Sequence, residues 1–237
     1  AIGLDAAMAD WDAVSHLQGL EFIDAYLESA DITIEASVDP GADWSEPGPL
    51  VIVANHHLGL LDALVSMSVA LPRRPDSKGL ANRLLSILPQ VAPIMIPVPP
   101  PSAGSAAVSE VRPVVTHVSS GHALAVCPAG QVADRKPDGS VSDRPWSTKL
   151  GRIIQHTRAD VATISIEGRS SSRFYAARAI HFRLGTTMLM REFVSQRGRT
   201  VPVHVGRRIP FEELAPLTEP ARLMAVLRDA TYKPLAR

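Results

Sequence analysis

The sequence predicts an α/β fold: a single domain with a mixed, largely parallel central sheet flanked by helices, plus an N-terminal helical segment. Short apolar, β-branched runs alternate along the chain with segments of helical periodicity. Three of these runs end directly in polar, glycine-containing turns. Because ligands of such sheets bind beyond the carboxyl ends of the strands, the three turns are the places to look for a functional site.

Length and composition fit one globular domain. We assign residues 1–237 to a single domain, with residues 1–35 as the N-terminal helical segment and residues 45–235 as the α/β core. The chain is 46% hydrophobic, 20% charged and only 5% aromatic, which excludes a disordered chain and predicts an aliphatic core. A single cysteine, Cys127, allows no intramolecular disulfide and is typical of the reducing cytoplasm.

The elements follow from the periodicity of the apolar residues. Helical spacing within residues 6–30 predicts one or two amphipathic helices, and alternation at residues 32–36 predicts a short strand. The continuous apolar run of residues 50–54 predicts a buried strand, followed by a turn and a helix over residues 60–71. Further along, the pattern predicts helices at 80–88, 108–119, 149–157, 187–196 and 221–231, and strands at 95–98, 123–127, 161–166 and 201–205.

Charge is unevenly distributed although the net charge is zero. Residues 1–50 hold 11 acidic side chains and no Lys or Arg, whereas residues 135–208 hold 15 Lys or Arg and 5 acidic side chains. Two interpretations remain open: two solvated faces that pair with each other, or a basic surface for a phosphorylated ligand, an acidic carrier protein or an anionic membrane. Few aromatic residues accompany the basic ones, so we expect no nucleic-acid partner.

Neither of the two apolar stretches is suited to cross a membrane. Residues 49–71 contain two histidines and an aspartate, which are costly in lipid, and residues 84–101 are broken by several prolines. We therefore expect a cytoplasmic protein, with at most peripheral contact with the inner face of the membrane.

The turn after the first buried strand carries the residues best suited to catalysis. Here Asn55, His56, His57 and Gly59 precede Asp62. Histidine can accept a proton near neutral pH, and a carboxylate bonded to its other nitrogen would fix the tautomer and stabilise the imidazolium. The alternative is a pair of turn histidines near an aspartate that caps a helix. No third ligand lies close by in the sequence, so we expect no metal.

Two later turns carry groups that can bind a polar ligand. The turn that contains Pro128, Gly130 and Gln131 combines a glycine with an amide that both donates and accepts hydrogen bonds. In the turn after the third such strand, Gly168 precedes Arg169, which is able to bind a phosphate or a carboxylate. Their alternatives are an ordinary strand-end turn and a loop salt bridge. Cys127 lies in an apolar run and is predicted to be buried and inert.

In this order the three segments resemble the lysophospholipid acyltransferase superfamily, whose signature is a His and an Asp separated by four residues. More closely they resemble its bacterial hemolysin-like branch, which includes lyso-ornithine-lipid acyltransferases. Its Asn-His-Pro-x-Gly-Gly-x-Asp turn is similar to Asn55–Asp62, and its Phe-Pro-Ala-Gly-Glu-Val is similar to Cys127–Val132. Three later segments of the branch are similar to Asp143–Trp146, Ile166–Tyr175 and Gly206–Pro210.

Three positions depart from the pattern of the branch. His57 stands where the branch has proline, so that His57 has the superfamily's four-residue spacing to Asp62, whereas alignment to the branch selects His56. We favour His56. Gln131 replaces an acidic residue in the region that the family uses for the acyl acceptor, and Lys149 replaces a glycine.

The resemblance implies transfer of a fatty acyl group from an acyl-carrier-protein or acyl-coenzyme A thioester to a hydroxyl or amine of a lysolipid-like acceptor. It implies no bound cofactor, and backbone amides near the first turn would stabilise the oxyanion. A thioester hydrolase and a non-catalytic module that binds acyl chains or carrier proteins are the alternatives. The resemblance assigns the general base to His56 or His57, its orientation to Asp62, acceptor binding to Gly130, Gln131 and Arg169, and the shape of the turns to Asn55, Gly59, Pro128 and Gly168.

Overall fold

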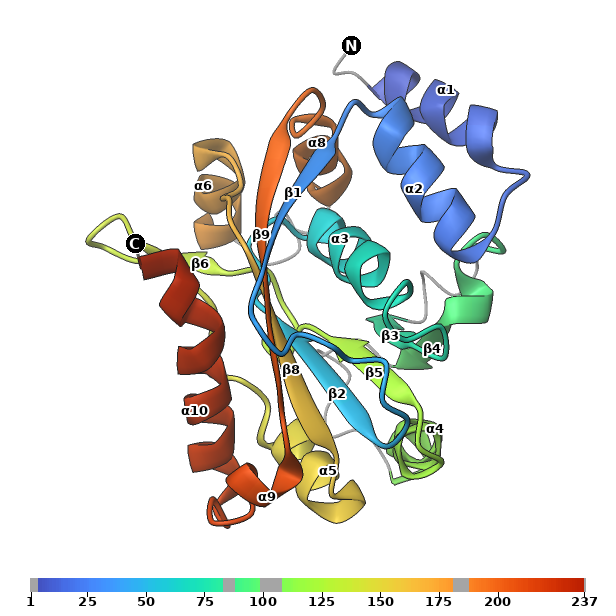
Figure 1. The fold of residues 1–237 in the computed structure, drawn as a ribbon. Helices are drawn as coiled ribbons and strands as arrows, with labels where there is room; N and C mark the ends of the chain where they lie inside the picture. Colours follow the sequence, from blue (N-terminus) through green and yellow to red (C-terminus); the bar gives the residue numbers. More distant parts are fainter. Residues whose placement is uncertain (1–3, 83–87, 99–107, 181–187, 237) are drawn as a thin grey trace.

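A computed structural model describes residues 4–82, 88–98, 108–180 and 188–236, and it confirms the α/β fold (Figure 1). Seven strands form one sheet in the order β1-β9-β8-β2-β5-β3-β4. These strands are β1 (Thr33–Val38), β2 (Leu50–Ala54), β3 (Lys78–Asn82), β4 (Met95–Val98), β5 (Ala123–Val126), β8 (Asp160–Ile166) and β9 (Thr200–Ile209). The helices are α1 (Leu4–Val14), α2 (Gly19–Ser29), α3 (Leu60–Ala70), α4 (Val108–Ser119), α5 (Thr148–Thr157), α6 (Ser172–Ile180), α8 (Leu189–Val194), α9 (Phe211–Leu214) and α10 (Pro220–Tyr232).

The sheet is mixed but largely parallel, as predicted. Strand β2 lies near its centre and pairs in parallel with both β5 and β8, and the pairs β5–β3, β3–β4 and β1–β9 are parallel as well. Strands β8 and β9 are antiparallel. Because β2, β5 and β8 run in the same direction, the turns that follow them emerge at the same edge of the sheet.

Strand β2 can be apolar throughout because each of its two faces meets a hydrophobic core. Leu50, Ile52 and Ala54 belong to the core under α2 and α3, whereas Val51 and Val53 belong to the core under α4, α5 and α10. All five side chains are buried. This explains why the strand shows a continuous run instead of the alternation of a half-exposed strand.

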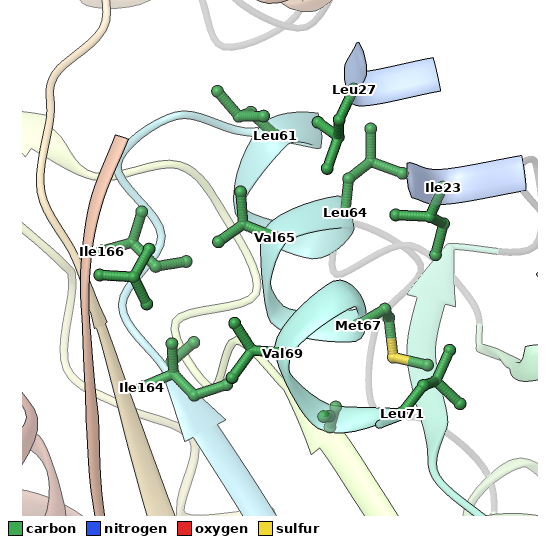
Figure 2. Packing of buried hydrophobic residues seen from close by; sticks show 14 of the residues in the cluster. Ile23, Leu27, Leu61, Leu64, Val65, Met67, Val69, Leu71, Ile164 and Ile166 are labelled. Carbon is green, nitrogen blue, oxygen red and sulfur yellow. The ribbon is translucent and has the colours of Figure 1, made fainter. Parts of the chain in front are cut away.

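Helix α3 packs between the sheet and α2, and this packing fixes the start of the helix at the edge where the turns after β2, β5 and β8 emerge. Figure 2 shows Val69 facing Ile164 of β8, while Leu64 faces Ile23 and Leu27 of α2. Full burial of an aliphatic side chain of this size contributes about 1.5–3 kcal/mol to folding. The packed core therefore holds the first turn of α3 in place.

The helix predicted at residues 80–88 is wrong in its first part. Residues Lys78–Asn82 form strand β3, which pairs with β5 on one side and β4 on the other; residues 83–87 lie outside the described residues. Gly79 shows why the strand fits here, since a Cβ at this position would lie 2.8 Å from the sulfur of Met95. Pairing between two strands overrode a local sequence with helical spacing.

Strand β9 is longer than the predicted strand at residues 201–205 because it has two partners along its length. It pairs in parallel with β1 and antiparallel with β8. At Gly206, which belongs to one of the segments that resemble the acyltransferases, a Cβ would overlap the Thr163 hydroxyl of β8. A glycine is needed because the two strands approach each other closely.

The sequence did not predict the small hairpin of β6 (Asp134–Arg135) and β7 (Val141–Ser142), or the helices α6 and α9. The strands of the hairpin are too short to show a period. Among the described residues, no helix combines the length and the apolar character that crossing a membrane requires.

Candidate active site

The turns after β2, β5 and β8 meet at one edge of the sheet, as the sequence predicted. Asn55 bridges two of them: its side-chain amide donates to the carbonyl of Ile166 at 2.9 Å, and its side-chain oxygen accepts from the amide of Ile166 at 2.7 Å. The Sγ atom of Cys127 lies 3.7 Å from the carbonyl oxygen of Asn55. Asn55 is fully buried, so its role in shaping the turn is structural.

The aspartate of the first turn organises the start of α3. Gly59 precedes the helix with φ +70°, a conformation that favours glycine. Asp62 Oδ2 accepts hydrogen bonds from the backbone amides of Leu58 at 2.7 Å and Gly59 at 2.9 Å. The carboxylate is fully buried, and its Oδ1 has no hydrogen-bond partner among the described residues. Two backbone amides thus fix the oxygen that faces the turn.

The two neighbouring histidines have different partners. His56 Nδ1 lies 3.0 Å from Asp62 Oδ2, and 19% of the His56 side chain is exposed. His57 instead lies with Nε2 2.8 Å from the hydroxyl of Tyr232, in the last turn of α10. The histidine paired with Asp62 is therefore His56, which we favoured from the sequence. The pair is separated by five residues, not by the four of the superfamily signature.

The backbone of His56 is held on both sides. Its amide donates to Asp143 Oδ1 at 3.2 Å, and its carbonyl accepts from the amide of Ala133 at 2.7 Å. Trp146 Nε1 donates to the other oxygen of Asp143 at 3.0 Å. These bonds give a structural reason for the Asp143–Trp146 segment, which the sequence pattern marked without assigning it a role.

The expectation that amides of the first turn stabilise an oxyanion is wrong for three of them. The amide of His56 is bonded to Asp143, and those of Leu58 and Gly59 are bonded to Asp62. Each donor already has an anionic acceptor, so a reacting oxyanion would need donors from elsewhere.

The environment of His56 favours its protonated form. Burial lowers the pKa of His56, but the Cys127 sulfur and the Asp62 carboxylate raise it, and the pKa lies well above the ordinary value of 6.5. Burial in turn raises the pKa of the Cys127 thiol, which is therefore uncharged near neutral pH. When the thiol is uncharged, the Asp62 carboxylate is the negative charge beside His56, and both its hydrogen bond and its charge raise the pKa of His56.

The raised pKa predicts how activity depends on pH. A histidine acts as a base only when it is neutral, so kcat/KM should rise about tenfold per pH unit and level off at the His56 pKa, above 6.5. The folded protein binds this proton more tightly than the unfolded chain. The pair therefore stabilises the fold fully below the unfolded pKa, and this stabilisation is lost as the pH rises through the folded pKa. A pH–rate profile checks the prediction, and a plateau reached below pH 6.5 would contradict it.

The second turn is held by backbone hydrogen bonds, and the side chain of Gln131 in this turn has a partner within the protein. Gly130, with φ +65°, donates its amide to the carbonyl of Cys127 at 3.0 Å, and the carbonyl of Pro128 accepts from the amide of Ser147 at 3.1 Å. The side-chain oxygen of Gln131 accepts from Arg178 at 3.2 Å. Gln131 thus has a protein partner on a neighbouring helix.

The third turn forms the wall of a cavity. Gly168 has φ +140°, and a Cβ there would lie 2.9 Å from Leu58, so glycine lets this turn pack on the first one. The next residue, Arg169, lines a cavity of about 400 Å³. Its remaining lining comes from the β6–β7 hairpin, the start of α6 and the segment before β9: Arg135, Gly139, Val141, Ser170, Ser171, Ser172, Tyr175, Ser195, Gln196 and Arg199.

The cavity borders the turn that contains the histidines. Ser170, in its wall, donates its hydroxyl to the carbonyl of His57 at 3.0 Å. Three arginines and several hydroxyl groups make the cavity suited to an anion. Of the residues predicted to bind the acceptor, Arg169 lines it, whereas Gly130 and Gln131 do not. Within the described parts of the chain, no three His, Cys, Asp or Glu side chains are grouped as a metal site would require.

Sequence reasoning missed Tyr232, Arg135 and Arg199. Tyr232 lies 175 positions after His57, and no local pattern marks a tyrosine at a helix end as the partner of a histidine. Arg135 belongs to a two-residue strand, and Arg199 directly precedes β9. The excess of basic residues over 135–208 was the one signal that pointed to such arginines.

Fold and site together define an α/β protein with a His–Asp pair, its aspartate buried and its histidine partly exposed, at the carboxyl edge of its sheet. The family described as "Acyltransferase" matches residues 11–233, so the chain belongs to this acyltransferase family and is an acyltransferase. It is 27% identical over 223 residues to a lyso-glycine lipid O-acyltransferase of Phocaeicola vulgatus, covering 91% of this chain and 78% of that protein. A lyso-glycine lipid O-acyltransferase of Bacteroides thetaiotaomicron is 29% identical over 224 residues, covering 91% and 80%.

A solved structure supports the fold. The crystal structure of the 1-acyl-sn-glycerophosphate (LPA) acyltransferase PlsC from Thermotoga maritima matches with a TM-score of 0.57 and 15% identity. The match covers 99% of this chain and 83% of that one. The two chains therefore share the sheet and its flanking helices.

Proposed function

We propose that the protein transfers a fatty acyl group from an acyl-carrier-protein or acyl-coenzyme A thioester to the hydroxyl of a lysolipid whose head group is anionic. The observation that carries this proposal is the 3.0 Å contact between His56 Nδ1 and Asp62 Oδ2 at the edge where the three turns meet. With Nδ1 used by the carboxylate, Nε2 is the nitrogen that acts on the substrate. The relatives named as lyso-glycine lipid O-acyltransferases support a hydroxyl acceptor.

The proposed reaction needs no covalent enzyme intermediate. His56 Nε2 takes the proton of the acceptor hydroxyl while the hydroxyl oxygen attacks the thioester carbonyl. The new O–C bond forms, the C–S bond breaks, and the leaving thiolate takes the proton back from the imidazolium. Asp62, through Oδ2, keeps the proton of the neutral ring on Nδ1 and stabilises the positive charge that forms.

We place the head group of the acceptor in the arginine-lined cavity. A glycine joined to a fatty acid through its nitrogen keeps a free carboxylate, and a guanidinium can bind a carboxylate with two parallel hydrogen bonds. The cavity offers Arg135, Arg169 and Arg199, and its wall is bonded to the carbonyl of His57 through Ser170. A head group held there would leave its acyl chain beside the turn that bears His56.

A thiol-release assay tests the proposed reaction. The protein is incubated with acyl-carrier-protein or acyl-coenzyme A, with and without a hydroxy-fatty-acyl glycine. We expect release that depends on the acceptor. Release without an acceptor would show a hydrolase, and binding of the thioester without any release would show a binding module; either result would overturn the proposal.

Two arginine substitutions test the place of the head group. Arg169→Ala and Arg199→Ala should each raise the KM for the glycine acceptor about 10- to 100-fold, the range expected for losing a hydrogen bond between charged groups. kcat should change much less. The methyl ester of the same acceptor has no carboxylate, so its kinetics should be nearly the same in both variants and in the parent protein. Arg222→Ala, at an exposed position of α10, is the matched control. Equal losses for acid and ester would contradict this placement.

A further inference from the structure

The hydroxyl of Tyr232 lies between the ring of His57 and the backbone amide of Asp143. It accepts a hydrogen bond from the backbone amide of Asp143 at 2.9 Å and lies 2.8 Å from His57 Nε2. A backbone amide can only donate, so the proton of the hydroxyl remains available for His57. Burial raises the pKa of Tyr232, which keeps this proton in place. The acceptor for it is the unprotonated Nε2 of His57.

We infer that Tyr232 is a positioning residue that holds His57 as the neutral Nδ1–H tautomer and thereby leaves the neighbouring His56 as the histidine that takes the proton. A ring whose Nε2 lone pair is engaged by a buried hydroxyl cannot accept a proton without breaking that bond. This inference rests on the proposed function, since it explains how one of two adjacent histidines is selected.

The same hydroxyl also reaches the backbone of His56 through Asp143. The backbone amide of Asp143 donates to the Tyr232 hydroxyl, and Asp143 Oδ1 accepts from the amide of His56 at 3.2 Å. Arg228 supports the arrangement: its guanidinium lies 4.7 Å from the centre of the Tyr232 ring and donates to the carbonyl of Asp143 at 3.1 Å. One tyrosine therefore braces both histidines.

The position of Tyr232 is set by the core and does not depend on the site. Its helix, α10, buries Leu223, Met224 and Leu227 in the second core, together with α5 and β2. Figure 1 shows α10 running along the sheet with its carboxyl end toward the hairpin of β6 and β7. Removing only the hydroxyl should leave this packing intact, so Tyr232→Phe should fold.

The decisive measurement is the tautomer of His57 in ¹⁵N-labelled protein, because an unprotonated imidazole nitrogen is readily distinguished by NMR from a protonated one. We expect an unprotonated Nε2 in the parent protein and a mixture of forms in Tyr232→Phe. A protonated Nε2 in the parent protein would overturn the inference. This readout does not depend on acyl transfer, so failure of the proposed function, seen as absent transfer by the parent protein, is a separate result.

Kinetics provide the second test. Tyr232→Phe should lower kcat about 10- to 100-fold with little change in KM, as for loss of a residue that orients its neighbour. Tyr26→Phe, a buried tyrosine of the other core, is the control. His57→Gln places an amide oxygen near the position of Nε2 and should retain far more kcat than His57→Leu. Equal losses in these two His57 variants, or an unchanged kcat in Tyr232→Phe, would contradict a positioning role.

Discussion

We expect His56→Asn to lower kcat by about 10²- to 10⁴-fold, the range for removing a general base. Asparagine is chosen because its amide nitrogen lies near the position of Nδ1 and can still donate to Asp62 Oδ2, which accepts from His56 at 3.0 Å. The buried carboxylate thus keeps its partner, and the change removes only Nε2. Acceptor-dependent thiol release measures the loss.

The control for this variant is its neighbour. His57→Gln preserves the contact with Tyr232. It should lose much less activity, because His57 contacts Tyr232 and not Asp62. Thermal unfolding of both variants shows whether either substitution disturbs the fold. A larger loss in His57→Gln than in His56→Asn would make His57 the base and reverse the assignment.

The sequence predicts the part of the site that is formed by neighbouring residues of the chain. A buried strand at 50–54 followed by Asn55, two histidines and Asp62 predicted a strand, a turn and a helix, and the structure has all three. The convergence of three turns followed from the direction of parallel strands alone. The choice between His56 and His57 could not follow from spacing, because both lie within reach of a carboxylate on the first helical turn.

What could not be predicted depends on contacts between distant segments. The tyrosine that contacts His57 belongs to α10, and two of the three arginines that line the cavity come from the β6–β7 hairpin and from the residue before β9. Strand β3 was misassigned because its place between β5 and β4 is a property of the sheet, not of residues 78–82. Arg178, which donates to the side chain of Gln131, could not be predicted as its partner because it belongs to the unpredicted helix α6.

Asp62→Asn should lower kcat about 10²- to 10³-fold and move the pH–rate profile toward acid. The amides of Leu58 and Gly59 donate to Oδ2, so in the variant the amide oxygen should occupy this position and continue to accept from His56 Nδ1. The tautomer is then preserved and only the negative charge is lost. Because the Asp62 carboxylate raises the pKa of His56, its neutralisation should lower that pKa, and the plateau of kcat/KM should begin at a lower pH.

The free energy of unfolding distinguishes loss of the Asp62 charge from a general destabilisation of the turn. The new amide group takes the place of Oδ1, which is buried and has no partner among the described residues, so the free energy of unfolding should fall by about 1–3 kcal/mol. Asp62→Ala instead removes the acceptor of His56 and of two backbone amides, and it should unfold more readily than Asp62→Asn. An Asp62→Asn variant whose kcat is lowered but whose plateau begins at the same pH as in the parent protein would show that Asp62 does not set the pKa of His56. The carboxylate would then act by orienting the ring alone.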